Sequence, residues 1–290
     1  MSPSVVSVIS PGLTEAQRNA LISLLADDDP AVYQVVRQKL LSFGEAARDW
    51  LRPHLLSNEA TLRRHAHEII DRLDRQAADI QFLAFCLSKG EDLDAEEGSW
   101  LLARTRYPDV NPAGYQALLD SYAGDLLERI DFGAAPDQIL ATINRYFFEE
   151  LSFSGNEQNY YEPDNSYLNR VVDRRLGNPV SLCLIFLFIT RRLRLPVTGI
   201  GTQGPFICRF QTSKEELYID VFNKGRLLTK GECLKFLPQA SRGFQDGYLT
   251  PTTPRRTLLR LCSDLHQIYV HLNDREESER LQRYIIALAK

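Results

Sequence analysis

The fold is decided by one stretch of the sequence, residues 176–222, which reads LGNPVSLCLIFLFITRRLRLPVTGIGTQGPFICRFQTSKEELYIDVF. Asn178 and Pro179 predict the start of a helix, because Asn is a good N-cap and Pro loses nothing at the first helical position. The residues that follow are apolar all round, which predicts a buried central helix. After Pro196 the pattern changes to period two and predicts three strands, over 197–201, 206–210 and 217–222.

The last two strands are predicted to form a hairpin through the turn at 211–216. A symmetric turn places Phe210 opposite Leu217 and Ile207 opposite Asp220, so that Pro205 is a diagonal neighbour of Asp220. A slip by one residue would move Asp220 to the other face of the sheet.

Asp220 is expected to face a cleft, because it alternates with the apolar residues of its strand. A buried carboxylate needs a partner. Arg209, on the same predicted face, and donors from a polar loop at 152–169 are the candidates.

Amphipathic helices are predicted upstream, from Thr14 to about Asp74. Thr14 and Gln17 form a capping box, and Pro30 suits the first turn of a second helix. Two more helices follow, over 45–56 and 59–73. The phrase LISLLADDDPAVYQVVRQKLLSFGEAARDWLRPHL resembles a HEAT repeat, which usually presents a binding face. An ordinary helical cap on the next domain is the alternative.

Helical patterns also occupy residues 95–104, 112–130 and 136–151, and they return after Pro254. Between them lies the loop SFSGNEQNYYEPDNSYLN, at 152–169. Loops of this length are often functional.

Composition excludes several classes of protein. With 34 Lys+Arg against 38 Asp+Glu the net charge is −4, so nucleic acid is not an expected partner. The longest apolar stretch, 182–189, is far shorter than the roughly 20 residues of a membrane span. The N-terminus has no basic region typical of a signal peptide, so we expect a cytoplasmic protein without a membrane segment.

The five cysteines are scattered singly, which argues against a disulfide framework. His65 and His67 do not share a helix face, which argues against a metal pair. No histidine lies between residues 68 and 265. We expect no metal and no cofactor.

The segments NYYEPDNSYLNRVVDRRLGNPVSLCLIFLFITRRLRLPVTGIG, GPFICRF and YIDVFNKGRLLTKGEC resemble the SirB-type bacterial branch of the transglutaminase-like superfamily. The resemblance covers roughly residues 95–290. It implies an α+β, predominantly helical fold, divided into a HEAT-like region (1–78), a SirB-type helical segment (79–150), a transglutaminase-like core (151–240) and a helical, TPR-like tail (241–290).

Enzymes of this superfamily use a Cys at the start of the buried helix, a His on the first hairpin strand and an Asp on the second. By the resemblance, the thiol position falls at Pro179 or Ser181, the base position at Pro205 and the third position at Asp220. Only the Asp is retained. Cys183 and Cys208 are expected to be inert core residues.

A polar cluster is predicted to line a pocket beside these positions, or alternatively to hold the loop together by side-chain-to-backbone hydrogen bonds. Its candidate residues are Asn159, Tyr160, Asn165, Ser166, Asn169, Arg175, Asn178 and Arg209.

The leading functional hypothesis is a catalytically degenerate protein that binds a protein or peptide partner. One alternative is a hydrolase or acyl-transferase that uses Ser181 or a cysteine with an unrecognised base. Another is a structural or regulatory adaptor.

Overall fold

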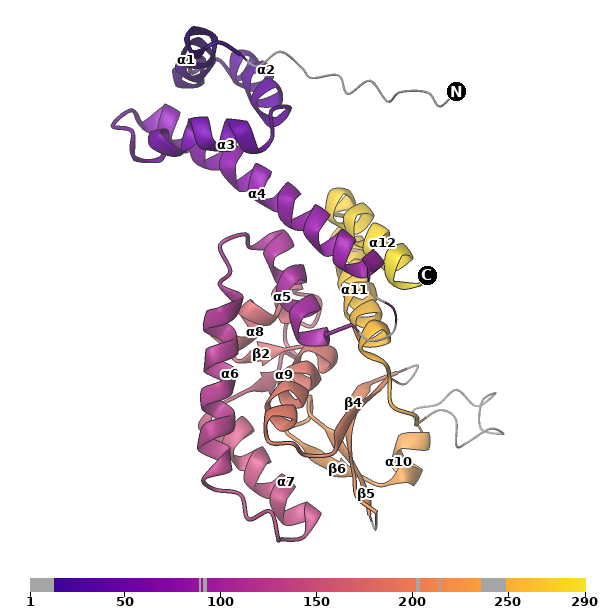
Figure 1. Cartoon of the computed structure of the whole chain (residues 1–290). Coiled ribbons are helices and arrows are strands. Elements are labelled where there is room, and N and C mark those ends of the chain that lie inside the picture. The colour runs from indigo at the N-terminus through magenta and orange to yellow at the C-terminus, as the bar shows by residue number, and fades with distance from the viewer. Residues whose placement is uncertain (1–12, 89, 91–92, 202–203, 214, 236–248) are drawn as a thin grey trace, which may run out of the picture. The chain divides into compact units, whose positions relative to one another are not determined.

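Helices dominate the computed structural model, which describes residues 13–88, 90, 93–201, 204–213, 215–235 and 249–290. The chain divides into two compact units, Met1–Ala77 and Ala78–Lys290, and the boundary falls within one long helix. The helices that begin in the first unit are α1 (Glu15–Ser23), η1 (Leu24–Ala26), α2 (Pro30–Leu41), α3 (Glu45–Leu51), η2 (Arg52–Leu56) and α4 (Ala60–Ser88) (Figure 1).

The first unit begins as the sequence predicts. Thr14 and Gln17 form the capping box of α1, and Pro30 opens α2 behind the N-cap Asp29. A core of its own includes Leu25, Leu40, Leu51, Ala66 and Ile69.

Two helices of this unit differ in detail from the prediction. The helix predicted over 45–56 is α-helical to Leu51 and continues to Leu56 as the 3-10 helix η2, and the one predicted over 59–73 continues to Ser88. His65 is buried: its Nδ1 lies 2.7 Å from the carbonyl oxygen of Leu25, and its ring stacks on Tyr33. Whether these helices form a HEAT repeat stays a prediction.

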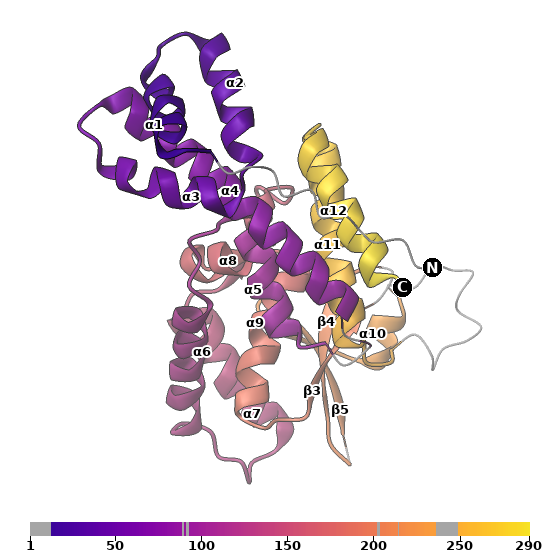
Figure 2. The same ribbon diagram turned by 45° about the horizontal axis from the view of Figure 1, so that its top comes forward.

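The second unit contains the central helix and the sheet. Its helices are α5 (Ala95–Arg106), α6 (Pro112–Leu127), α7 (Pro136–Asn144), the π-helix η3 (Arg145–Glu150), η4 (Pro163–Asn165), α8 (Leu168–Arg174), α9 (Pro179–Arg192), α10 (Lys230–Leu234), α11 (Pro254–His271) and α12 (Arg275–Leu288) (Figure 2).

The sheet is antiparallel, with strands in the order β3 (Val197–Gly201), β4 (Phe206–Gln211), β5 (Glu216–Asp220) and β6 (Arg226–Leu228). The predicted hairpin register is confirmed, because Phe210 pairs with Leu217 and Cys208 with Ile219. β6 was not predicted. A short parallel pair, β1 (Ser154–Gly155) and β2 (Leu176–Gly177), joins the polar loop to the start of α9.

Helix α9 lies at the centre of this unit, between α6 and the sheet (Figure 1). Its residues from Val180 to Thr190 are all buried except Leu187, so the predicted buried helix is confirmed. One face of the sheet packs on α9 through Cys208 and Ile219. The other face carries Tyr218 and is covered by Cys233 of α10 and by Leu249.

The buried carboxylate of Glu96 holds the C-terminal end of α9. Glu96 of α5 is 2% exposed, and Arg192 donates to both of its carboxylate oxygens, at 2.8 and 2.9 Å. Arg191 binds the same carboxylate. Both arginines at the end of α9 are therefore paired with a buried carboxylate.

The second unit shares one main core, to which α5, α9, α11 and α12 all contribute. The α+β, predominantly helical class is thus confirmed. The divisions predicted at 150 and 240 fall inside this unit, and residues 241–248 of the predicted tail lie outside the described residues. α11 and α12 form a helical hairpin; its TPR-like character stays a prediction. No helix within the described ranges combines the length and hydrophobicity needed to cross a bilayer.

Candidate functional site

The site predicted from the sequence centres on the start of α9, where a reciprocal cap closes the helix. Asn178 accepts a hydrogen bond from the backbone N–H of Ser181 (2.8 Å), and the Ser181 hydroxyl accepts one from the N–H of Asn178 (3.0 Å). Pro179 occupies the first helical position between them. The capping box satisfies donors that helix starts otherwise leave open.

The Ser181 hydroxyl is also bound on its donor side. It is fully buried and lies 2.6 Å from the carbonyl oxygen of Asn165, to which it donates. A serine nucleophile needs a base that takes this proton. In this structure the hydroxyl instead donates a hydrogen bond to a main-chain carbonyl.

The polar loop is held together by the amides and hydroxyls that the sequence singles out. Asn165 donates to the carbonyl of Asn159 (2.7 Å) and accepts from Asn156 (2.9 Å), and Asn178 donates to the hydroxyl of Ser166 (2.8 Å). Asn165, Ser166 and Asn178 are buried. These contacts are of the kind that staple a loop to a helix start.

Two other pocket candidates lie beside this network. Asn169 is buried on α8. Arg175 has a left-handed backbone (φ +60°), donates to the Tyr122 hydroxyl at 2.5 Å and stacks on Phe153. Stacking of this kind anchors the guanidinium against aromatic rings.

Asp220 has partners other than those expected. Its Oδ1 accepts from the backbone N–H of Asn223 (3.1 Å) and its Oδ2 from the Asn223 side chain (2.7 Å). Arg209 instead pairs with Glu216 (3.0 Å) and donates to the carbonyl of Leu249 (3.1 Å). The expectation that Arg209 or the polar loop binds Asp220 was therefore wrong, because a local turn supplies the donors first.

The cysteine on α9 and the cysteine on β4 are both enclosed by the hydrophobic core. Cys183 and Cys208 are both fully buried, and the Cys183 thiol lies 3.5 Å from the carbonyl oxygen of Phe206. Burial raises the pKa of Cys183 well above its ordinary value. Because the thiolate is the nucleophilic form, this environment disfavours thiol chemistry.

An aromatic groove opens outside the loop network. Its volume is about 520 Å³, and we define it by its lining residues Gln158, Asn159, Tyr160, Tyr161, Glu162, Pro163, His271 and Leu272. Tyr160 and Tyr161 are 44% and 52% exposed. Tyr161 stacks on His271, and Tyr160 meets Phe222 edge to face, two residues beyond Asp220. The groove therefore begins beside the end of β5.

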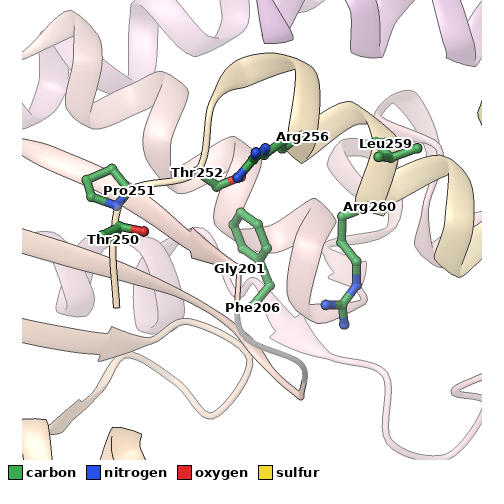
Figure 3. A pocket seen from close by; sticks show the side chains of 8 residues that line it. All are labelled: Gly201, Phe206, Thr250, Pro251, Thr252, Arg256, Leu259 and Arg260. Atoms are coloured by element: carbon green, nitrogen blue, oxygen red, sulfur yellow. The ribbon is translucent and has the colours of Figure 1, made fainter. Parts of the chain in front are cut away.

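A second hollow, the arginine cavity, lies at the other end of α11 and has a volume of about 290 Å³ (Figure 3). Its lining residues are Gly201, Phe206, Thr250, Pro251, Thr252, Arg256, Leu259 and Arg260. Arg260 donates to the carbonyl of Gly204 at 2.8 Å, next to Pro205.

One face of α11 borders both hollows. Arg256, Arg260, Asp264 and His271 recur at helical spacing. Burial raises the pKa of Tyr160, and the nearby Asp264 carboxylate adds to this shift. No recognised motif of the sequence includes this face. Its signal in the sequence was the spacing of four from Arg256 to Arg260 to Asp264, which lies beyond the last recognised motif, ending at Cys233.

No group of three or more His, Cys, Asp or Glu side chains suited to a metal ion occurs in the part of the chain that the structure describes.

Comparisons with known proteins agree with this architecture. Residues 113–263 match the family described as transglutaminase-like superfamily. The UPF0162 protein of Xylella fastidiosa (strain 9a5c) is 34% identical over 204 residues, which cover 68% of this chain and 73% of that protein. The UPF0162 protein of Pseudomonas aeruginosa is 26% identical over 186 residues, or 63% of this chain and 67% of that protein.

A shorter part of the chain is similar to a mammalian protein. F-box only protein 21 of Mus musculus is 35% identical over 104 residues, which cover 33% of this chain and 17% of that protein. No solved structure matches the chain.

Proposed function

This chain belongs to the transglutaminase-like superfamily, and on that premise we propose that it is a catalytically degenerate member that binds a peptide, or a segment of a protein partner, in the aromatic groove. The observation that carries the proposal is the closed start of α9. Pro179 and Ser181 stand where the resemblance puts the thiol, and neither offers a nucleophile: Pro has none, and the Ser181 hydroxyl donates to Asn165.

The missing base adds to this support. Pro205 stands at the position that the resemblance gives to His, and Pro cannot transfer a proton. The remaining carboxylate, Asp220, is bound within its own turn by Asn223. A hydrolase that uses Ser181 or Cys183 has less support, because both groups are fully buried.

Binding is supported by the aromatic groove itself. Tyrosine is one of the residue types enriched at the energetic centres of protein interfaces. Tyr160 and Tyr161 line the groove on the loop that the Asn network holds in place, and their rings pack against Phe222 and His271, which favours an ordered binding surface. Pre-ordering lowers the entropic cost of binding.

Part of this chain resembles a small part of a much longer protein, which is consistent with a binding role. The stretch similar to F-box only protein 21 makes up 17% of that longer mouse protein. A structural or regulatory adaptor that acts through the N-terminal helices remains the second candidate, favoured by the separate core of that unit.

Peptide selection tests the binding proposal. The full chain is immobilised and random peptides are selected on it, and the affinities of enriched peptides are measured by fluorescence anisotropy. A Tyr160→Ala, Tyr161→Ala variant should weaken them by about tenfold or more, as loss of interface anchors does. Phe132→Ala is the matched control, since Phe132 is similarly exposed but lines a different hollow. If the enriched peptides bind the tyrosine variant as tightly as wild type, peptide binding in the aromatic groove is refuted.

Turnover assays test the catalytic part. Peptide, amide and ester substrates should turn over no faster with wild type than with a Cys183→Ala, Cys208→Ala variant. Cysteine-dependent turnover accompanied by a stoichiometric covalent adduct would show that the chain is an enzyme.

A further inference from the structure

The arginine cavity has a charge pattern that the proposed function does not use. Its lining contains two cationic side chains, Arg256 and Arg260, and no carboxylate among the described residues. The ring of Phe206 and the side chain of Leu259 supply apolar surface. In Figure 3 both arginines extend from α11 on the side that holds the strand ends at Gly201 and Phe206.

The two arginines differ in how they are held. Arg260 donates through Nε to Asp264 (2.8 Å) and through Nη2 to the carbonyl of Gly204 (2.8 Å), so its guanidinium has a fixed orientation. Arg256 is exposed, and no carboxylate of the described residues pairs with it. Asp264 pairs with Arg260, which leaves Arg256 as the cation of the described lining that no described carboxylate neutralises.

The walls of the cavity are fixed to the sheet. The backbone N–H of Thr252 donates to the carbonyl of Gly199 at 2.9 Å, which ties the 250–252 segment to β3. Gly204, which accepts from Arg260, directly precedes Pro205. The cavity is therefore a built feature of the fold beside the former base position.

We propose that the arginine cavity binds a carboxylate of the same peptide that the aromatic groove holds. This inference rests on the proposed function. A carboxylate carries one negative charge and matches Arg256, the lining cation that has no carboxylate partner among the described residues, whereas a phosphate monoester carries about −1.5 to −2. Guanidinium groups bind carboxylates through paired, charge-assisted hydrogen bonds.

The distance between the two hollows fits a short peptide. Fifteen residues of α11 separate Arg256 from His271, which at about 1.5 Å per residue is roughly 22 Å. An extended peptide covers that length in about seven residues. The carboxylate can belong to an Asp or Glu side chain or to the C-terminus of the peptide, and these sources are separated by the test.

The test observes the arginine Nε–H signals of the full chain by NMR at constant ionic strength. The probes are N-acetylglutamate α-amide, which has a side-chain carboxylate, and N-acetylglycine, which has a terminal one. N-acetylglutamine amide is the neutral control, and inorganic phosphate is the competing anion. At least one carboxylate should shift the Arg256 signal in a saturable way, and the stronger of the two identifies the source.

Two variants locate the binding. Arg256→Gln should raise the Kd of the carboxylate probe about tenfold, because a charge-assisted hydrogen bond is lost. Arg275→Gln is the control: Arg275 is an exposed arginine of α12 that does not line the cavity, and its loss should leave the Kd unchanged. An unchanged Tm shows that each variant is folded.

The outcomes separate the two proposals. Saturable carboxylate binding without any selected peptide would refute the proposed function and the shared peptide, and would leave the cavity as a site for a free carboxylate. Selected peptides that bind through the tyrosines, with no saturable shift of Arg256, would overturn the cavity proposal alone. Tighter binding of phosphate than of either carboxylate would also overturn it.

Discussion

The carboxylate of Asp220 accepts both of its described hydrogen bonds from one residue, Asn223. The turn between β5 and β6 is built on this pair and on Gly225, whose φ of +71° and close approach to Asn144 leave no room for a side chain. From the sequence, Asp220 could be recognised as a carboxylate in need of a partner. The partner itself could not, because local side-chain-to-backbone bonds compete with long-range ones that the strand pattern suggests.

Asp220→Asn should therefore lower stability and leave peptide affinity intact. The new amide would point N–H groups at the donor of Asn223, and losing a buried hydrogen bond costs about 1–2 kcal/mol in the free energy of unfolding. Denaturant unfolding measures this, with Asn223→Ala as the companion variant; the two losses should not add, since both remove one contact. Abolished peptide binding with an unchanged free energy of unfolding would instead make Asp220 a recognition residue.

Asp264 predicts a pH dependence of stability. Burial raises the pKa of this carboxyl, although Arg260 opposes the shift. A carboxyl whose pKa is higher in the folded than in the unfolded state destabilises the fold as pH rises from the unfolded pKa through the folded pKa. Relative to wild type, Asp264→Asn should thus be more stable at pH 7 than at pH 3.5. Chemical unfolding at both pH values checks this, and a relative stability that falls with pH would contradict it.

At the scale of elements, α9 and strands β3 to β5 could be predicted because each has a strong pattern: an apolar run behind a cap, or strict alternation. The elements that were missed have none. β6 has three residues, of which Arg226 and Leu227 are exposed. The π-helix η3 inserts within a stretch whose apolar spacing still resembles an α-helix.

The central position of α9 gives the largest expected mutational effect. Phe186 is fully buried and packs edge to face on Phe147. Phe186→Ala should lower the free energy of unfolding by about 3–5 kcal/mol, as large-to-small core changes do. Leu227→Ala, at an exposed position of β6, is the control and should change it little. A loss below about 1 kcal/mol for Phe186→Ala would mean that α9 is not the core helix.

The whole molecule has two units with separate cores, so it should not unfold as a single cooperative body. Leu51→Ala removes a buried side chain of the first core and Phe186→Ala one of the second. In calorimetry each variant should lower the Tm of a different transition. One transition that both variants shift equally would show that the two units unfold together.

The candidate site illustrates what the sequence leaves open at this scale. The positions of Pro179, Pro205 and Asp220 follow from order and spacing along the chain. The face of α11 that carries Arg256 and Arg260 becomes part of a cavity only when the C-terminal hairpin packs on the unit, and helical spacing alone cannot say which face meets which strand.

The salt bridge between Glu96 and Arg192 joins residues 96 positions apart, and this separation has a consequence for synthesis. Ribosomes add about 5–20 residues per second, so Glu96 emerges about 5–20 s before its partner. During that interval Trp100 and Leu102 cannot be buried against α9, with which they share a core in the complete protein. The first unit carries its core within residues 22–73 and can be complete by then. During this part of synthesis the nascent chain would thus have a folded first unit and an incomplete second unit with exposed apolar residues. Chaperones bind chains in this form.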